Sequence, residues 1–322
     1  MKKAWYSSLI ILVLFSFFMS CTLQDGLHTK GVDESPISYK TENVIIVVID
    51  GPRFSETLGD STGTYSPFLT KDFLKDGGLA LTNFYNDGFT YTNSGHAAIL
   101  TGFRQEIRND GTELPQRPSI FQAWLKHTGK QNKSAWLVTS KGKLDILANT
   151  QDSTWHNKYL PSTSCGIDSG KRNRGDLLTF DEALSILKTD RPNLMLINLK
   201  DPDVAGHQKK WGNYLKGIQQ SDSLVSVLWS FLKNDQNYNG KTTLLVTNDH
   251  GRHTDGISDG FINHGDGCEG CRHITLFAAG PDFKKNIKIN TLYRQRDIAA
   301  TVAELLNFKL ATEGTVMQDL FK

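Results

Sequence analysis

Continuous apolar runs that alternate with helical patterns constrain the fold of this chain more than any other feature of its sequence. The clearest run is NVIIVVI at residues 43–49, and NLMLINL at residues 193–199 is a second. Apolar, often β-branched residues without polar alternation are typical of strands buried on both faces, as in a parallel sheet. Further strands are predicted at residues 79–84, 134–139, 242–247 and 273–279.

Helical patterns separate these strands. One begins near Ser66-Pro67, because serine is a favourable N-cap and proline fits the first helical position. Thr179-x-x-Glu182 has the capping-box pattern and predicts a helix to about residue 188. The other predicted helices cover residues 95–101, 119–127, 213–232 and 294–306. This alternation predicts an α/β fold, with a mostly parallel central sheet flanked by helices, in one domain over residues 43–322.

Residues 140–178 lack a clear period and are rich in Ser, Thr, Asn, Gly and Lys. Such a long stretch without structure is uncommon inside a compact domain. Two interpretations stay open: a small insertion on the substrate side of the domain, or elements that the sequence pattern does not reveal.

The N-terminus is typical of an export signal. Lys2 and Lys3 precede an apolar stretch of about 13 residues, which is short for a transmembrane helix and suits a signal peptide. Phe18-Met19-Ser20-Cys21 has the form of a lipobox, although Phe18 stands where leucine is usual. We expect residues 1–20 to be a signal peptide; a plain signal peptide without lipidation and an uncleaved anchor are the alternatives.

The polar residues 22–42 then connect a lipidated Cys21 to the folded part, as a tether. These features predict an exported lipoprotein of the bacterial cell envelope, anchored in a membrane and facing the periplasm. The formal charge of +2 falls to zero when Lys2 and Lys3 leave with the signal. A balanced chain has no basic excess for nucleic-acid binding, so anionic ligands must be attracted by local groups.

Acidic residues and histidines follow several of the predicted strands. Asp50 follows the first run, Asp203 and His207 follow the second, and Asp249-His250 follows residues 242–247. Ligands of α/β sheets bind at the carboxyl ends of the strands, so these side chains should converge there. With His264 they offer mixed nitrogen and oxygen ligands for two divalent ions, which suits zinc and, less exclusively, manganese or iron. Each pair alone would more often be a surface pair or a helix cap.

A hydroxyl-rich segment, Thr90 to Gly102, contains the start of a predicted helix. A hydroxyl at a helix N-terminus gains from the positive end of the helix dipole, which favours an alkoxide and an anionic substrate. A nearby metal ion would lower the pKa of Thr92 further. An ordinary helix cap is the alternative interpretation.

Five motifs occur in one order along residues 43–308 and together resemble the alkaline phosphatase superfamily, in particular its nucleotide pyrophosphatase/phosphodiesterase-like branch. They are Val48-Ile49-Asp50-Gly51, Thr92-x-x-x-His96 with Thr101-Gly102, Asp203-x-x-x-His207, Asp249-His250-Gly251 and His264-Gly265. The resemblance implies a two-metal phosphoester hydrolase, with zinc as the metal and a small phosphoester as the substrate. It also implies that Thr92 is a nucleophile that forms a phosphothreonine.

Site residues follow from the same resemblance. Asp50, Asp249 and His250 match the ligands of the metal that also binds Thr92. Asp203, His207 and His264 match the ligands of the other metal, and Asn109 matches an asparagine that holds phosphoryl oxygens, although its spacing from Thr92 is short. Ser94 stands where diesterases carry proline and competes with Thr92 as nucleophile. His273 competes with His264, which fits better because glycine follows it.

Three arginines lie just after motif residues and could bind a substrate phosphate or serve only solubility: Arg53, Arg104 and Arg272. A sulfatase-like or phosphonate hydrolase and a non-catalytic binding lipoprotein are the alternative functions. Sulfatases of the superfamily need a Cys/Ser-x-Pro-x-Arg motif, which is not found near Thr92.

Cys268-x-x-Cys271 lies beside His264, and Cys165 is the other cysteine of the predicted domain. In an exported protein we expect Cys268 and Cys271 to form a disulfide, or Cys165 to pair with one of them. A redox or zinc role is less favoured, because the chain has no second CxxC motif.

Overall fold

The structure is a computed structural model that describes Met1 and residues 38–167 and 172–322. The predicted lipidation site Cys21, the predicted signal peptide beyond Met1 and most of the predicted tether lie outside the described residues. No helix in the described part combines the length and apolarity that a membrane crossing requires. Residues Tyr39–Lys322 form one compact unit.

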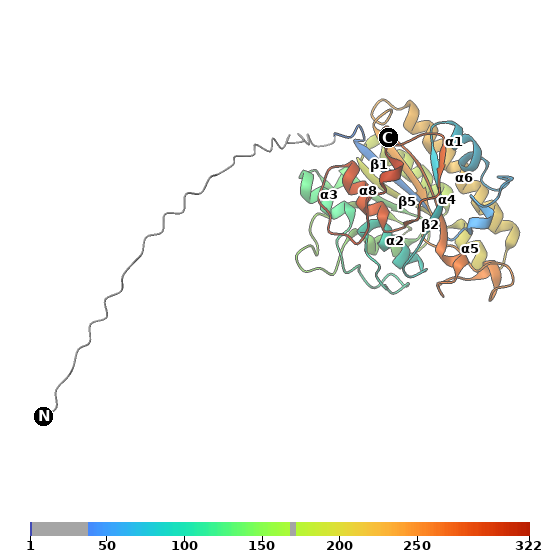
Figure 1. The fold of residues 1–322 in the computed structure, drawn as a ribbon, viewed down its shortest axis with the longest axis horizontal. Helices are drawn as coiled ribbons and strands as arrows, with labels where there is room; N and C mark the ends of the chain where they lie inside the picture. Colours follow the sequence, from blue (N-terminus) through green and yellow to red (C-terminus); the bar gives the residue numbers. More distant parts are fainter. Residues whose placement is uncertain (2–37, 168–171) are drawn as a thin grey trace. The chain divides into compact units, whose positions relative to one another are not determined.

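One nine-stranded sheet organises this unit, with the order β4-β3-β5-β1-β6-β7-β2-β8 and with β9 paired to β2. Figure 1 shows the sheet in the middle of the unit, with helices on either side of it. Only β7 runs antiparallel to its neighbours, β6 and β2. The mostly parallel sheet of the sequence prediction is confirmed. The strands are β1 (Asn43–Ile49), β2 (Leu79–Tyr85), β3 (Ala135–Thr139), β4 (Ser162–Cys165), β5 (Leu194–Leu199), β6 (Thr242–Thr247), β7 (His273–Ala279), β8 (Ile287–Ile289) and β9 (Tyr293–Arg294).

Helices cover both faces of the sheet. They are α1 (Phe73–Lys75), α2 (Thr92–Thr101), α3 (Ile120–Thr128), α4 (Asp176–Thr189), α5 (Asp201–His207), α6 (Trp211–Asn234), α7 (Glu269–Arg272) and α8 (Asp297–Leu305). Residues of β1 alternate between two apolar clusters. Val44 and Ile46 belong to the cluster with α2, α3 and α8, whereas Ile45 and Val47 belong to the cluster with α4 and α6. This two-sided burial explains why β1 has no polar alternation.

Two helix starts differ from the sequence prediction. The helix predicted from Ser66-Pro67 is a π-helical turn, Phe68–Asp72, that continues into α1. The prediction that a capping box at Thr179 begins a helix is wrong, because α4 begins three residues earlier. The Thr179 hydroxyl instead donates to the Gly175 carbonyl within the first turn of α4. In contrast, the helix predicted at residues 119–127 is present as α3, and Ser119 caps it by accepting a hydrogen bond from Gln122 N.

Residues 140–178 contain elements that their composition did not reveal. The segment runs through a 3₁₀ stretch, Gly142–Ala148, and then adds β4 to the edge of the sheet beside β3. Strands β8 and β9 were also not predicted; they have only three and two residues, too few for a period to be seen.

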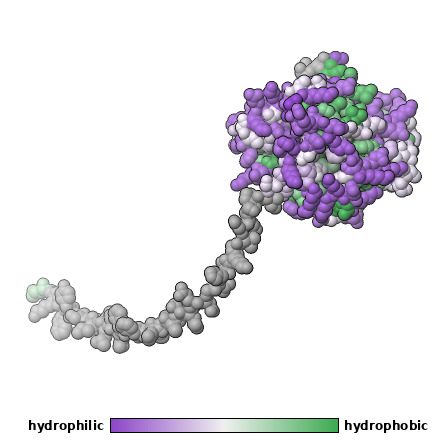
Figure 2. Space-filling view, turned by 90° about the horizontal axis from the view of Figure 1, so that it is seen from above, coloured by the Kyte–Doolittle hydropathy of each residue, from purple (hydrophilic) through white to green (hydrophobic). Residues whose placement is uncertain are grey.

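The face of the molecule in Figure 2 is mostly hydrophilic, with apolar side chains in small separate patches.

Candidate metal centre

Three acidic residues meet at the carboxyl ends of neighbouring strands. Asp50 follows β1, Asp249 lies two residues beyond β6, and Asp203 lies in α5, just after β5. These strands are adjacent in the order β5-β1-β6, which brings together side chains that are far apart in sequence. All three residues are buried, at 0 to 3% exposure. Buried carboxylates so close together require compensating positive charge.

Asp50, Asp249 and His250 form the first group of candidate ligands. His250 Nε2 lies 3.3 Å from Asp249 Oδ2 and 3.7 Å from Asp50 Oδ1. Asp249 Oδ1 accepts hydrogen bonds from the backbone N–H groups of Gly51 and His250. The opposite oxygen, Asp249 Oδ2, and His250 Nε2 are buried and have no hydrogen-bond partner among the described residues. Two orphaned acceptors that face each other fit a cation between them.

Asp203, His207 and His264 form the second group. His207 Nε2 lies 3.1 Å from His264 Nε2, and Asp203 Oδ1 lies 3.3 Å and 3.4 Å from these nitrogens. Ligand atoms about 2.0–2.1 Å from a tetrahedral zinc ion stand roughly 3.3 Å from one another. The trio therefore has the spacing of three zinc ligands. His264 also stacks on His250, with ring centroids 3.7 Å apart, which joins the two groups.

The three histidines are held in the same tautomer. Nδ1 faces the Thr90 carbonyl in His264, the Gly251 carbonyl in His250 and Asn263 Oδ1 in His207. These oxygens can only accept, so each Nδ1 carries the hydrogen and each Nε2 keeps its lone pair for the centre. Metal-binding histidines are oriented in this way by their outer partners. The predicted ligands are thus brought together, and the residues present fit two divalent ions.

Thr92 begins α2, and its hydroxyl lies at the floor of a cavity of about 1020 Å³ that Asp203 and His207 also line. The helix can approach because Gly95 has no side chain: a Cβ there would lie 2.4 Å from the Asp249 carbonyl oxygen. Ser94 does not line this cavity. Its hydroxyl accepts a hydrogen bond from Ile107 N and holds the following loop. The geometry favours Thr92 over Ser94.

The positions of the two histidines also bear on the second open alternative. His273 is stacked between Phe54 and Tyr85, with centroid distances of 3.8 and 4.7 Å. Its Nε2 faces the Thr82 carbonyl rather than the acidic centre. The geometry therefore favours His264 over His273 as a candidate ligand.

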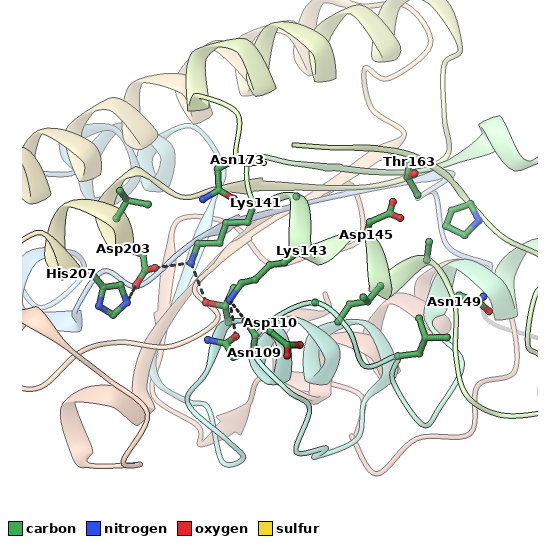
Figure 3. A pocket seen from close by; sticks show the side chains of 18 of the residues that line it. Asn109, Asp110, Lys141, Lys143, Asp145, Asn149, Thr163, Asn173, Asp203 and His207 are labelled. Carbon is green, nitrogen blue, oxygen red and sulfur yellow. Dashed lines mark hydrogen bonds and ion pairs between the residues drawn. The ribbon is translucent and has the colours of Figure 1, made fainter. Parts of the chain in front are cut away.

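Lys141 lies at the middle of the centre and was not predicted. Its Nζ donates to Asp203 Oδ2 at 2.6 Å (Figure 3). It also donates to Asp50 Oδ1 at 2.9 Å and to Thr92 Oγ1 at 3.1 Å. Burial works against its charged form, but attraction to the carboxylates outweighs burial and raises the pKa of Lys141 above its usual range. The residue lies in the segment without periodicity, so no sequence signal distinguished it from other lysines.

Arg252, the second unpredicted cation, is fully buried beside Asp203. Its Nη1 donates to Asp203 Oδ1 at 2.5 Å. The guanidinium fits because a Cβ on Gly51 or Gly206 would lie 2.9 or 2.6 Å from it. Two cations and three carboxylates leave one net negative charge, so two divalent ions would make the centre positive.

Burial raises the pKa values of the acids in the centre, whereas nearby positive charge lowers them. Burial, with repulsion from Asp249, raises the pKa of Asp50 to about 7. Burial would also raise the pKa of Asp249, but His250 and His96 outweigh it and hold that pKa below its usual value. His96 Nδ1 donates to the Thr92 carbonyl at 2.9 Å and also lies 3.3 Å from Asp249 Oδ2. His96 therefore links the first turn of α2 to a candidate ligand carboxylate.

Asn109 and Lys143 line the cavity next to Thr92 (Figure 3). Asn109 Oδ1 accepts from Asn93 N at 3.1 Å and from Lys143 Nζ at 2.8 Å, so its amide N–H groups are the donors available to a ligand. Burial, with repulsion from Lys141, lowers the pKa of Lys143 to about 8. Asn109 thus lies where a phosphoryl-binding residue is expected.

The three predicted arginines do not line this cavity. Arg53 is buried and bonded to Glu56 and Asp255. Arg272 donates to the backbone oxygens of Gly267, Asn86 and Gly88. Arg104 lies near Asp87 and Glu313 at the surface. These positions do not support the prediction that the three arginines bind substrate. Lys141 and Lys143 are the cationic side chains that line the cavity instead.

The cysteines at positions 165, 268 and 271 are free thiols in the structure. Cys268 Sγ and Cys271 Sγ lie 3.3 Å apart, beyond the bonding distance of about 2.05 Å. Cys165, in β4, is buried and faces the Leu137 carbonyl. The structure therefore contains none of the predicted pairings among these residues.

Comparison with known proteins identifies a family to which this chain is similar. The model of the Metalloenzyme superfamily matches residues 92–310. Phosphopentomutase of Clostridium kluyveri is 25% identical over 215 residues, which cover 63% of this chain and 50% of that protein. Phosphopentomutase of Clostridioides difficile is 27% identical over 158 residues, which cover 48% of this chain and 37% of that protein. The chain thus spans half or less of the length of these curated relatives.

Solved structures share the fold over the whole compact unit. Alkaline phosphatase PafA superposes with a TM-score of 0.68 at 13% identity, covering 89% of this chain and 99% of that one. Murine ectonucleotide pyrophosphatase/phosphodiesterase 5 superposes with a TM-score of 0.63 at 16% identity, covering 87% of this chain and 100% of that one. Since the family model covers more than half of the sequence, the chain belongs to the metalloenzyme superfamily, the alkaline phosphatase superfamily that its motifs resemble.

Proposed function

We propose that this protein is a metal-dependent phosphoester hydrolase in which Thr92 is the nucleophile. The observation that carries the proposal is the position of Thr92 Oγ1, which lies 3.1 Å from Lys141 Nζ at the floor of a cavity lined by ligand residues. A hydroxyl nucleophile beside cationic donors and candidate metal ligands suits attack on phosphorus. Membership of a metalloenzyme family supports the same reaction class.

In this proposal Thr92, Lys141 and Asn109 have different roles in the reaction. Thr92 Oγ1 forms a bond to phosphorus while the bond to the leaving-group oxygen breaks, and water later hydrolyses the phosphothreonine. The ammonium of Lys141 stabilises the alkoxide, and the amide of Asn109 donates to phosphoryl oxygens. Two bound divalent ions, which we propose to be zinc, would supply Lewis acidity to the nucleophile and to the leaving oxygen.

We further propose a preference for monoesters over diesters. Lys141 and Lys143 both line the cavity, and the pKa of Lys143, about 8, keeps it mostly charged at neutral pH. Asp50 and Asp203, which bond Lys141 in this structure, are also candidate ligands of divalent ions, and bound ions would share their negative charge and leave the ammonium of Lys141 available to a substrate. A monoester dianion carries one more negative charge than a diester and gains more from these cations.

Export and membrane anchoring complete the proposal. They rest on the N-terminal sequence, where an apolar stretch precedes Cys21. A lipid-anchored enzyme would meet small phosphoesters at the envelope. Metabolic labelling with a fatty acid, compared between wild type and Cys21→Ser, tests the anchor; equal labelling of both would contradict it.

The reaction is tested with an aryl phosphate monoester, a bis-aryl phosphate diester and an aryl sulfate. We expect monoester turnover to exceed diester turnover, with no sulfate turnover. Thr92→Ala should lower monoester turnover by at least about 1,000-fold with metal content unchanged, because the nucleophile is removed and the ligands remain. Ser94→Ala, the matched control, should keep activity within about tenfold.

Full activity of Thr92→Ala would overturn the nucleophile assignment. Isomerisation of a pentose phosphate without release of inorganic phosphate would instead favour a mutase, the activity named for the Clostridium kluyveri relative.

A further inference from the structure

A second cluster of metal-ligating side chains lies outside the catalytic centre. His253, Asp266, Cys268 and Cys271 each place one ligand atom within 4.8 Å of the others. Asp266 Oδ2 lies 3.3 Å from His253 Nε2, and Asp266 Oδ1 lies 3.6 Å from Cys271 Sγ. None of the four belongs to the motifs that carry the proposed hydrolysis.

His253 is oriented toward the cluster. The residue is 5% exposed, and its Nε2 is buried with no hydrogen-bond partner among the described residues. Its Nδ1 lies 2.6 Å from Asp259 Oδ1. A carboxylate on Nδ1 holds the hydrogen there and leaves the Nε2 lone pair for a metal, as the outer partners do for His207, His250 and His264. The same orientation is used at a fourth histidine that the catalytic centre does not include.

The two cysteines present their sulfurs from one turn. Cys268 precedes α7, Cys271 lies within it, and Cys271 N donates to the Cys268 carbonyl at 3.0 Å. This C-x₂-C spacing is common in zinc sites. The Sγ–Sγ distance of 3.3 Å is close to the roughly 3.8 Å expected for two thiolates on one tetrahedral zinc ion.

We propose that His253, Asp266, Cys268 and Cys271 bind a structural Zn²⁺, separate from the catalytic metals. Thiolate and imidazole ligands in a set of four favour zinc over magnesium, calcium or manganese. Cysteine binds zinc as the thiolate, so zinc binding would release the thiol protons of Cys268 and Cys271.

The site would hold the loop that carries three catalytic ligands. Asp259 bonds His253 through one oxygen and Asn263 through the other, and Asn263 Oδ1 faces His207 Nδ1 at 3.0 Å. The Cys271 carbonyl accepts from Gly251 N, next to His250. Zinc would therefore position the catalytic ligands without touching the substrate.

Cobalt substitution tests the site independently of the proposed hydrolysis. Thiolate-to-cobalt charge transfer gives near-ultraviolet absorption, and the catalytic centre has no thiolate to produce it. We expect this absorption in the wild type at one equivalent of thiolate-bound Co²⁺ per chain. It should persist in Cys165→Ala, the matched control, and disappear in the Cys268→Ser/Cys271→Ser double variant together with one zinc ion per chain.

A milder variant keeps the test valid if the double cysteine variant does not fold. Asp259→Asn should lower the zinc affinity of the site by about 10- to 100-fold, the usual effect of losing an outer carboxylate, while thiolate absorption remains at high Co²⁺. Absence of the absorption in wild-type protein isolated with reductant would overturn the proposal. So would a Cys268–Cys271 disulfide in protein isolated from its native compartment with thiols blocked, because oxidised sulfurs cannot bind zinc.

Discussion

At the scale of single residues, Lys141 is the side chain on which the metal centre most depends. Its ammonium bonds to Asp50, Asp203 and Thr92, so it occupies the position between nucleophile and ligands. Removing one member of a buried charge group costs about 3–5 kcal/mol, because the remaining charges lose their partner. A divalent ion can take over that partnership.

We therefore predict that the effect of Lys141→Met depends on metal. In the presence of a chelator the free energy of unfolding should fall by about 3–5 kcal/mol, whereas saturating zinc should reduce the loss to roughly 1 kcal/mol or less. Denaturant unfolding in both conditions measures this difference. Lys143→Met is the control: among the described residues the Lys143 ammonium bonds to Asn109 and to no carboxylate, so its loss should cost little in either condition. Equal losses with and without zinc would contradict this role of Lys141.

Residue identity was predicted best where chemistry and local pattern coincide. Asp50, Asp249 and His250 stand directly after apolar runs, so sheet topology alone brings them together. Lys141, Arg252 and His253 have no such pattern. Their roles depend on neighbours up to 91 residues away, as between Lys141 and Asp50, and such contacts leave no periodic signal.

At the scale of elements, the close approach of α2 to the end of β6 positions Thr92, the proposed nucleophile. A Cβ at Gly95 would lie 2.4 Å from the Asp249 carbonyl oxygen and 3.1 Å from Asp249 Cβ. These atoms belong to backbone and to a metal-ligand residue, so they cannot move aside cheaply. The helix must shift instead.

We predict that Gly95→Ala lowers turnover by about 100-fold, the cost of displacing a reacting group by roughly 1 Å. Its free energy of unfolding should also fall by about 1–3 kcal/mol from overpacking. Gly212→Ala is the control: it lies in the first turn of α6, where a Cβ meets nothing within 4 Å, and it should gain up to about 1 kcal/mol. Steady-state kinetics and thermal unfolding measure both, and an active Gly95→Ala protein would show that α2 tolerates displacement.

Long strands were predicted well from the sequence, whereas very short strands and the starts of some helices were not. The strands β1, β5, β6 and β7 are apolar over six or seven residues, which sets their burial without reference to the rest of the chain. The start of α4 was missed because Gly175 and Asp176 begin it: Asp176 accepts bonds from Lys200 N and Asp201 N across the sheet edge. That stabilisation is tertiary and cannot be read from a local capping pattern.

At the scale of the whole molecule, we expect stability in the acid range to depend on a buried acid that is not among the candidate metal ligands. Asp222 of α6 is 2% exposed and accepts hydrogen bonds from Phe68 N and Leu69 N. Burial raises its pKa to about 6 from 3.8, although the two bonds partly oppose this shift. The folded protein therefore binds more protons than the unfolded chain between these values, and the unfolding free energy falls as pH rises through this range.

We predict that wild type loses up to about 3 kcal/mol relative to Asp222→Asn between about pH 4 and pH 6.5, because asparagine does not titrate. Denaturant unfolding of both proteins across this range gives the difference. Any effect of acid on the metal ligands is common to both and cancels. A difference that is constant with pH would contradict the raised pKa of Asp222.

The sequence by itself determined the mostly parallel sheet and the acids at its carboxyl edge, because each depends on local pattern and on one rule of sheet topology. Only the tertiary structure showed that α2 begins at Thr92 and gave geometric reasons to prefer Thr92 over Ser94 and His264 over His273. It also showed which cations line the cavity. It also brought His253 to the Cys268-x-x-Cys271 turn, a ligand set that the missing second CxxC motif had argued against. The physical reason is that a site is defined by which atoms face one another, and that depends on how loops return across the sheet.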